Sequence, residues 1–165
     1  MTPRHPYEDM ADYRHWRRAA GVTALNELDP VVRAGFAIAP TDKVATAGSC
    51  FAQHVKRHLE GAGFDTFVTE PAPQILPEEL QGEFQYGVYT TRSGNIYTAR
   101  QLRQLLQRAY GTFLPEVEVW EHEGGYVDPF RPQVARFESP EELAADRAQH
   151  LKAVRTMVET LSVFV

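Results

Sequence analysis

The chain has 165 residues, of which 43% are hydrophobic and 24% charged, a composition typical of one soluble globular domain with a sizeable core. Its formal net charge of −5 argues against nucleic acid as a partner, because binding a polyanion generally needs a basic surface. The single cysteine excludes an intrachain disulfide framework and a cysteine-rich zinc site, and no apolar run approaches the ~20 residues that span a membrane.

Residues 1–40 predict an irregular N-terminal segment that packs on the core, because several prolines punctuate it. A short helix is expected around Tyr13 to Ala20. The stretch "VVRAGFAIAP" at 31–40 predicts either an edge strand or a segment lying across the core. The N-terminus is polar and acidic and lacks the apolar core of a secretory signal, so we expect a cytoplasmic protein.

The predicted domain occupies residues 41–165 and opens with its strongest pattern. "KVATAG" predicts a short strand, "CFAQHVKRHLEGAG" a helix, and "FDTFV" a second strand. This order predicts a βαβ unit with parallel strands and a right-handed crossover. Helical spacing assigns the apolar face of the helix to Phe51, Val55, Leu59 and Ala62.

After a proline-rich connection, "YGVYTTRSGNIYT" at 86–98 predicts two short β-rich runs joined by a turn at "RSGN". A helix is then expected between Thr98, with Gln101 at capping-box spacing, and Gly111. "VEVWEHEGGYV" at 117–127 predicts a hairpin that turns at "EGG". The predicted buried stripe of the helix is Leu102, Leu105, Leu106 and Ala109.

The last helix is predicted to begin at Ser139, the cap, with Pro140 as its first residue. "SVFV" at 162–165 then predicts the beginning of a buried central strand. In an open α/β sheet, ligands bind beyond the carboxyl ends of the strands, so chemistry is expected after such a strand. An unpaired strand edge here also predicts self-association.

Ser49 lies between the first predicted strand and its helix, where free N–H groups and the positive end of the helix dipole favour a developing negative charge. The backbone N–H of Cys50 is a natural oxyanion-hole donor. Two alternatives remain open: Ser49 is only the helix N-cap, or Cys50 is the nucleophile. The sequence around Ser49 is not the Gly-x-Ser-x-Gly pattern, so an ordinary α/β-hydrolase is not supported.

"ATAGSCFAQHVKRHLEGAGF" resembles the signature block of the GSCFA-domain family, named for the letters Gly48 to Ala52. "SGNIYTARQLRQLLQRAYG" and "VDPFRP" resemble further blocks in the same order, and the resemblance covers about Asp29 to Val165. The family is similar to the SGNH, or GDSL-like, hydrolases. The resemblance implies a three-layer α/β, flavodoxin-like parallel sheet, incomplete at the C-terminus. It also implies ester hydrolysis or acyl transfer, often of acetyl groups on polysaccharides or other carbohydrates.

Carried onto this chain, the resemblance makes Ser49 the nucleophile, although a one-residue shift in register gives that position to Cys50. The superfamily uses a glycine N–H and an asparagine side chain as further oxyanion donors. These fall on Gly94 and Asn95, the only Gly-Asn pair in the chain. The alternative for this pair is the turn of a small hairpin.

Asp128 and Arg131 are candidate substrate-binding residues; the alternatives are an Asx-turn at Asp128 and an ion pair of Arg131 with a nearby acid. Family members continue past a strand like "SVFV", and that continuation supplies the late Asp–His pair. The general base therefore has no match here, and a non-catalytic remnant or carbohydrate-binding module is the alternative function. His54 and His58 have metal-ligand spacing but are interpreted as exposed polar positions, and we expect no metal and no cofactor.

Overall fold

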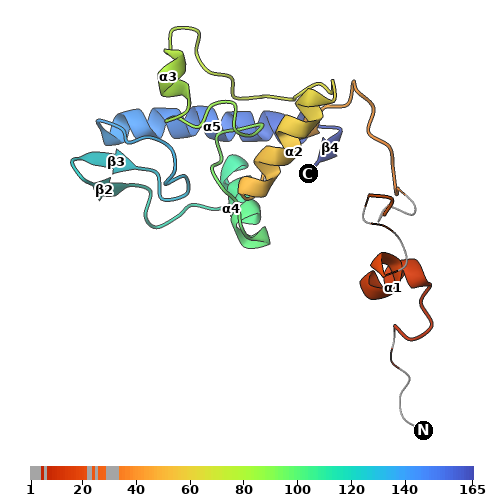
Figure 1. Cartoon of the computed structure of the whole chain (residues 1–165). Coiled ribbons are helices and arrows are strands. Elements are labelled where there is room, and N and C mark those ends of the chain that lie inside the picture. Colours follow the sequence, from red (N-terminus) through yellow and green to blue (C-terminus); the bar gives the residue numbers. More distant parts are fainter. Residues whose placement is uncertain (1–4, 6, 22–23, 25, 29–33) are drawn as a thin grey trace. The chain divides into compact units, whose positions relative to one another are not determined.

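The computed structural model describes residues 5, 7–21, 24, 26–28 and 34–165 (Figure 1). The chain divides into two compact units, residues 1–37 and 38–165, which are described separately. None of the helices in these described stretches is both long enough and apolar enough to pass through a lipid bilayer.

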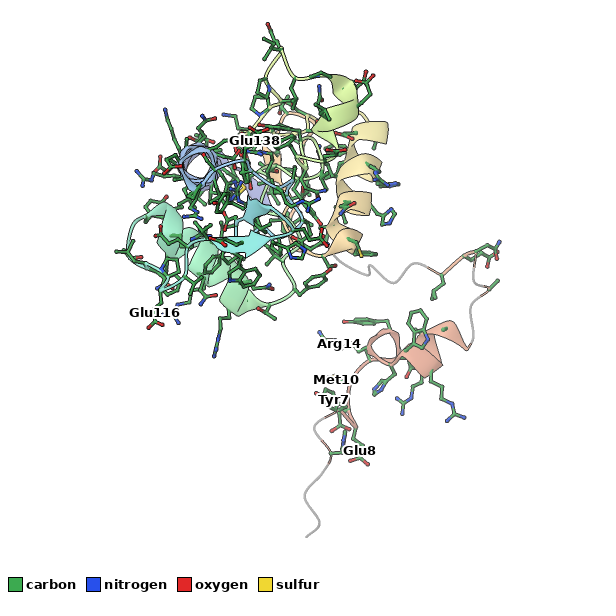
Figure 2. All side chains as sticks on the ribbon, turned by 90° about the vertical axis from the view of Figure 1, so that its left-hand side faces the viewer. Tyr7, Glu8, Met10, Arg14, Glu116 and Glu138 are labelled. Carbon is green, nitrogen blue, oxygen red and sulfur yellow. The ribbon has the colours of Figure 1, made fainter. Side chains whose placement is uncertain are left out.

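The first unit contains a 3₁₀ helix, η1 (Asp12–Arg14), and a helix α1 (Trp16–Ala20), which confirms the predicted short helix. An ion pair between Arg18 and Asp12 (3.2 Å) joins the two turns. The side chains of this unit, Tyr7 and Met10 among them, are drawn in Figure 2. Of the stretch predicted as an edge strand, 31–33 lies outside the described residues, and 34–40 forms no strand.

The second unit is a mixed α/β structure with a small parallel sheet. Strand β1 (Val44–Ala45) pairs in parallel with β4 (Val163–Phe164), so "SVFV" forms a strand of a parallel sheet. The prediction of a buried central strand is wrong for the described structure, because β4 pairs only with β1 and Phe164 and Val165 are 40% and 42% exposed. On the other side of β1, Thr66 forms a single parallel bridge with Val44. The predicted second strand at 64–68 is thus reduced to one bridge, because the chain turns away and the Thr69 N–H donates to Thr90 O (3.0 Å).

Helix α2 (Cys50–Gly61) confirms the predicted helix but corrects its buried face. Phe51 is 73% exposed, whereas Ala52 and Lys56 are buried. The strand-to-helix turn sets this orientation, because a side chain on Gly48 would lie only 3.1 Å from the Cβ of Ala52. Lys56 is accommodated because its ammonium group donates to the carbonyl of Gly87.

Helices α4 and α5 complete the main core. Helix α4 (Ala99–Ala109) has the predicted capping box between Thr98 and Gln101, and α5 (Pro140–Thr160) is capped by Ser139 as predicted. A short helix α3 (Glu78–Gln81) lies in the proline-rich connection. Helix α5 runs the length of the unit, with β4 near its end (Figure 1). The core between these elements consists of Ala45, Leu105, Ala109, Val154 and Met157.

The predicted hairpin is confirmed as β2 (Trp120–His122) and β3 (Gly125–Val127), which pair antiparallel. Its turn needs positive φ at two positions, and Glu123 and Gly124 have φ of 49° and 79°. The hairpin lies near the beginning of α5 (Figure 1) and packs on a second small core of Val134, Phe137 and Leu143.

The second predicted hairpin, around "RSGN", is wrong. Residues 89–94 form no strand and are buried, although most of them are polar. The segment instead bonds to the residues that follow β1: Thr46 N–H donates to Thr90 Oγ1 (2.8 Å), and the N–H of Ile96 donates to Gly48 O (2.8 Å). These long-range bonds replace the local turn that the sequence pattern predicts.

Buried charges join segments that are far apart in the sequence. Glu70 accepts from the backbone N–H (2.7 Å) and the Nε–H (2.8 Å) of Arg92. Arg92 Nη2 also reaches Asp146 on α5 (2.5 Å), which accepts from Arg131 as well (2.8 Å). Arg131 in turn donates to Asp128 (3.0 Å). We call these five residues the arginine network. Exposed carboxylates such as those labelled in Figure 2 lie outside it.

His150, on α5, is a neutral hydrogen-bond partner of Glu70 beside the arginine network. Burial lowers its pKa, and the nearby charge of Arg131 adds to this effect, so Nδ1–H donates to Glu70 Oε2 (2.8 Å). Burial alone would raise the pKa of Glu70, but the hydrogen bond with His150 and the charge of Arg92 outweigh it and lower that pKa to about 2. Glu70 is therefore ionised across the physiological range.

We predict that Glu70→Gln lowers the free energy of unfolding at pH 7 by about 3 kcal/mol, because it removes one of the two carboxylates that balance the buried charge of Arg92 and leaves only Asp146. The pKa of Glu70 is about 2 in the folded state, against an ordinary value of 4.5. Its contribution is therefore complete above pH 4.5 and is lost as the pH falls toward 2. Urea unfolding of both proteins between pH 7 and 3 tests this, and a difference that does not shrink below pH 4.5 would contradict it.

Candidate functional site

Ser49 occupies the turn between β1 and α2, at the carboxyl end of the parallel pair. Its Oγ accepts a hydrogen bond from the N–H of Phe51 (3.3 Å), so Ser49 is the N-cap of α2, as one of the two alternatives predicts. Cys50 is the first residue of the helix, and its thiol is free and exposed. As the first helical residue, Cys50 has no intrahelical acceptor for its N–H, which leaves this donor for a ligand.

Tyr89 connects this turn to the segment that bears the predicted oxyanion donors. Its side chain is 1% exposed, and its hydroxyl lies 3.0 Å from Ser49 O and 2.5 Å from Asn95 Oδ1. The same hydroxyl accepts from Gln53 Nε2 (3.1 Å), so Gln53 points toward the turn. Burial raises the pKa of Tyr89, which keeps the phenol protonated and able to donate.

The bond from Tyr89 orients the amide of Asn95. Because Oδ1 accepts from the phenol, Nδ2 points away from it, and Nδ2 makes no hydrogen bond within the described part of the chain. Gly94 precedes it with φ of 67°, and a Cβ there would lie 2.5 Å from Gln133 Oε1. The positive φ favours glycine at this position, whereas the end of the Gln133 side chain could move aside. The fold thus brings Gly94 and Asn95, which the family resemblance names as oxyanion donors, beside the Ser49 turn. The alternative for this pair, the turn of a small hairpin, does not form.

Asp128 and Arg131 lie in the arginine network, and each is 1% exposed. Asp128 Oδ1 accepts from the N–H of Phe130 (2.9 Å), which is the Asx-turn that one alternative predicts. Arg131 pairs with Asp128 and Asp146, as its alternative predicts. Burial would raise the pKa of Asp128, but the charge of Arg131 and the N–H of Phe130 hold it below its usual value. A substrate contact by either residue stays a prediction.

No histidine contacts Ser49 Oγ in the described structure. His54 and His58 are exposed on α2, as expected, and His150 is enclosed in the network. Across residues 5, 7–21, 24, 26–28 and 34–165, no group of three His, Cys, Asp or Glu side chains could hold a metal ion. The site therefore offers a serine and several hydrogen-bond donors, with no base in contact with the hydroxyl.

Asn95 also lines a pocket of about 270 Å³ between α4 and the segment after β3. Sequence analysis missed this pocket and its charged residue, Arg108. The signal was present: Arg108 falls on the buried stripe of α4, between Leu105 and Ala109, where a charge is unexpected. Tyr89 was missed because a single tyrosine in an irregular segment has no local pattern. The pocket is lined by Ser93, Asn95, Ile96, Tyr97, Gln101, Gln104, Leu105, Arg108, Pro129, Phe130, Pro132 and Gln133.

Comparison with known protein families gives one match. The sequence model of the GSCFA family matches residues 43–165, which contain the Ser49 turn, the Asn95 segment and the arginine network. Searches of the curated proteins and of the solved structures found no match.

We predict that Tyr89→Phe lowers the free energy of unfolding by about 2 kcal/mol, because it removes the single phenolic proton that Ser49 O and Asn95 Oδ1 share, and with it the acceptor of Gln53 Nε2. The side-chain amide signals of Asn95 should also shift in the NMR spectrum. Tyr97→Phe is the matched control, since that side chain is 64% exposed. Equal effects of the two substitutions would contradict the role given to Tyr89.

Proposed function

The chain belongs to the GSCFA family, and on this premise we propose that it is a serine esterase or O-acyltransferase of the SGNH type, acting on an acylated carbohydrate. Ser49 is the proposed nucleophile. The observation that carries the proposal is the Tyr89 hydroxyl, which lies 40 positions after Ser49 in the sequence and contacts both the Ser49 turn and Asn95.

The surroundings of Ser49 support attack on an ester. In the proposed reaction, Ser49 Oγ adds to the ester carbonyl carbon, and the carbonyl oxygen becomes negatively charged. The N–H of Cys50 and Asn95 Nδ2 are the proposed donors to that oxygen, with Gly94 N–H as a third. The tetrahedral adduct then collapses with cleavage of the C–O bond to the alcohol, and the proton lost by Ser49 Oγ is gained by the departing oxygen. Water or an acceptor hydroxyl next adds to the acyl carbon and gives up its proton as the bond to Ser49 breaks, which restores the Ser49 hydroxyl.

The strand order supports the proposed three-layer, flavodoxin-like fold. The segment at Thr66 and strand β4 lie on opposite sides of β1, so β1 is the middle one of three parallel segments. A doubly wound sheet with this order binds ligands at the carboxyl end of its first strand. Ser49 lies at that end of β1.

A second candidate function is a non-catalytic carbohydrate-binding module. Ser49 Oγ is engaged as a helix cap, and no described histidine contacts it. Both observations favour a turn that binds a ligand without attacking it. The two functions differ in one chemical property, the reactivity of the Ser49 hydroxyl.

We predict that a fluorophosphonate probe labels the wild-type chain covalently on Ser49, because an activated serine attacks phosphorus as it attacks an ester. Ser49→Ala should reduce labelling to background, and Cys50→Ala should leave it near the wild-type level. Intact-mass spectrometry with peptide mapping measures both.

Two results would count against the esterase. An unlabelled wild-type chain would favour the binding module, and labelling lost in Cys50→Ala but kept in Ser49→Ala would transfer the nucleophile to Cys50. The exposed thiol makes the second comparison necessary. Circular dichroism of each variant confirms that the fold is retained.

A further inference from the structure

Arg108, in the pocket beside Asn95, is a buried cation that the fold leaves without hydrogen bonds. Its exposure is 6%, and its side chain donates to no acceptor within the described residues. The nearest acid is Asp128, whose Oδ1 lies 3.8 Å from Nη2, beyond hydrogen-bonding distance. The guanidinium lies on the ring of Phe130 at 4.0 Å, which orients its plane but accepts no N–H bond.

Asp128 lies closer to two other guanidinium groups than to Arg108. The same carboxylate pairs with Arg131 at 3.0 Å and with Arg147 at 3.4 Å, both closer than Arg108. Arg131 also pairs with Asp146 (2.8 Å) and Arg147 with Glu118 (3.3 Å), so the guanidinium groups of this cluster have counter-charges nearby. What Arg108 lacks within the described part of the chain is a hydrogen-bond acceptor, and a buried guanidinium without one is costly unless a ligand supplies it.

The walls of the pocket supply further donors and no competing acid. Gln101, Gln104 and Arg108 share one stripe of α4, because they stand at i, i+3 and i+7. Gln133 faces them from the segment after β3, where its Oε1 passes over Gly94. The Gln101 Oε1 accepts from the N–H groups of Tyr97 and Thr98, which leaves its NH₂ group as a donor. No Asp or Glu is among the residues that line the pocket.

This set of groups matches a ligand with a single negative charge. One guanidinium with neutral amides balances a carboxylate, whereas a phosphate monoester carries about −1.5 to −2 charges at pH 7. At the start of α4 the capping box already occupies the N–H groups of Thr98 and Gln101, so these two donors are not available to an anion. The volume of about 270 Å³ suits one small substituent or sugar unit.

We propose that this pocket binds the carboxylate of an acidic saccharide, such as a uronic-acid unit, with Arg108 as its counter-charge. The inference rests on the proposed function, because it names the class of substrate for the Ser49 site. Asn95 forms part of both: it lines the pocket and shares the Tyr89 hydroxyl with Ser49. The bound carboxylate thus holds an ester on the same or the next sugar unit near the nucleophile.

The test is an NMR titration of the full chain with sodium glucuronate, carried out in the Ser49→Ala variant so that binding is measured without chemistry. Glucuronate should shift the side-chain amide signals of Gln104 and Gln133, and glucose should not. Arg108→Met is expected to weaken glucuronate binding about tenfold or more. Arg103→Met is the matched control, an exposed arginine on the same helix, and should bind as the parent does.

Gln104→Glu provides a second variant in case Arg108→Met fails to fold. It places a carboxylate in the pocket at a partly exposed position and should abolish glucuronate binding without disturbing the network. Unshifted Gln104 and Gln133 signals, equal binding by Gln104→Glu, or equal loss in Arg103→Met would overturn the proposal. Tighter binding of inorganic phosphate than of glucuronate would overturn the carboxylate assignment. Because labelling of Ser49 is a separate measurement, either proposal can fail alone.

Discussion

The ion pairs between Arg92, Glu70 and Asp146 hold together a domain whose regular hydrogen-bonded sheet is very small. Strands β1 and β4 pair over only two residues each, so the backbone ladder alone fixes little of the chain. Arg92 joins the segment after the second predicted strand to α5, and it does so while 2% exposed. Buried ion pairs often contribute little net stability against apolar groups of the same shape, but removing one partner is costly. Their effect here is to specify which segments meet, because Arg92 pairs with Glu70 on one segment and with Asp146 on α5.

This constraint reaches the candidate site through a few residues. Arg92 fixes the chain two residues before Gly94, whose positive φ then directs Asn95 toward the turn that follows β1. Tyr89, at the start of the same buried segment, contacts the turn through its hydroxyl, which lies 3.0 Å from Ser49 O. The site is therefore positioned by charge pairing and one phenol, in a stretch with no helix or strand. An irregular segment can hold a site in this way when most of its buried polar groups are satisfied. Residues 89–94 find partners in Thr46, which follows β1, and in Glu70, while the buried hydroxyl of Thr91 has no partner among the described residues.

Local chemistry made part of this structure predictable. The caps at Ser49, Thr98 and Ser139 and the turn of the β2–β3 hairpin follow from residues within three or four positions of each other, and all appear as expected. The segment around "RSGN" was mispredicted because its partners are the carboxyl end of β1 and an acid at Glu70, which no local pattern identifies. The buried face of α2 was misplaced by one position for a similar reason, since Gly48 and the turn orient the helix. The juxtaposition of Ser49 with Asn95 was implied only by family resemblance, and Arg108 by neither approach.

The missing hydrogen-bond acceptor of Arg108 is a consequence of the same interactions that build the fold. Asp128 must satisfy Arg131 to complete the network and Arg147 to anchor α5, so it has little left for Arg108. An apolar residue at 108 would relieve this strain, because the position is buried against Phe130 and needs no charge for packing. Proteins commonly retain such unfavourable groups where a ligand compensates them, at some expense of stability in the free state. A bound carboxylate would give Arg108 the hydrogen-bond acceptor that Asp128, at 3.8 Å, does not provide. Ligand binding and the stability of the domain are therefore coupled through this arginine.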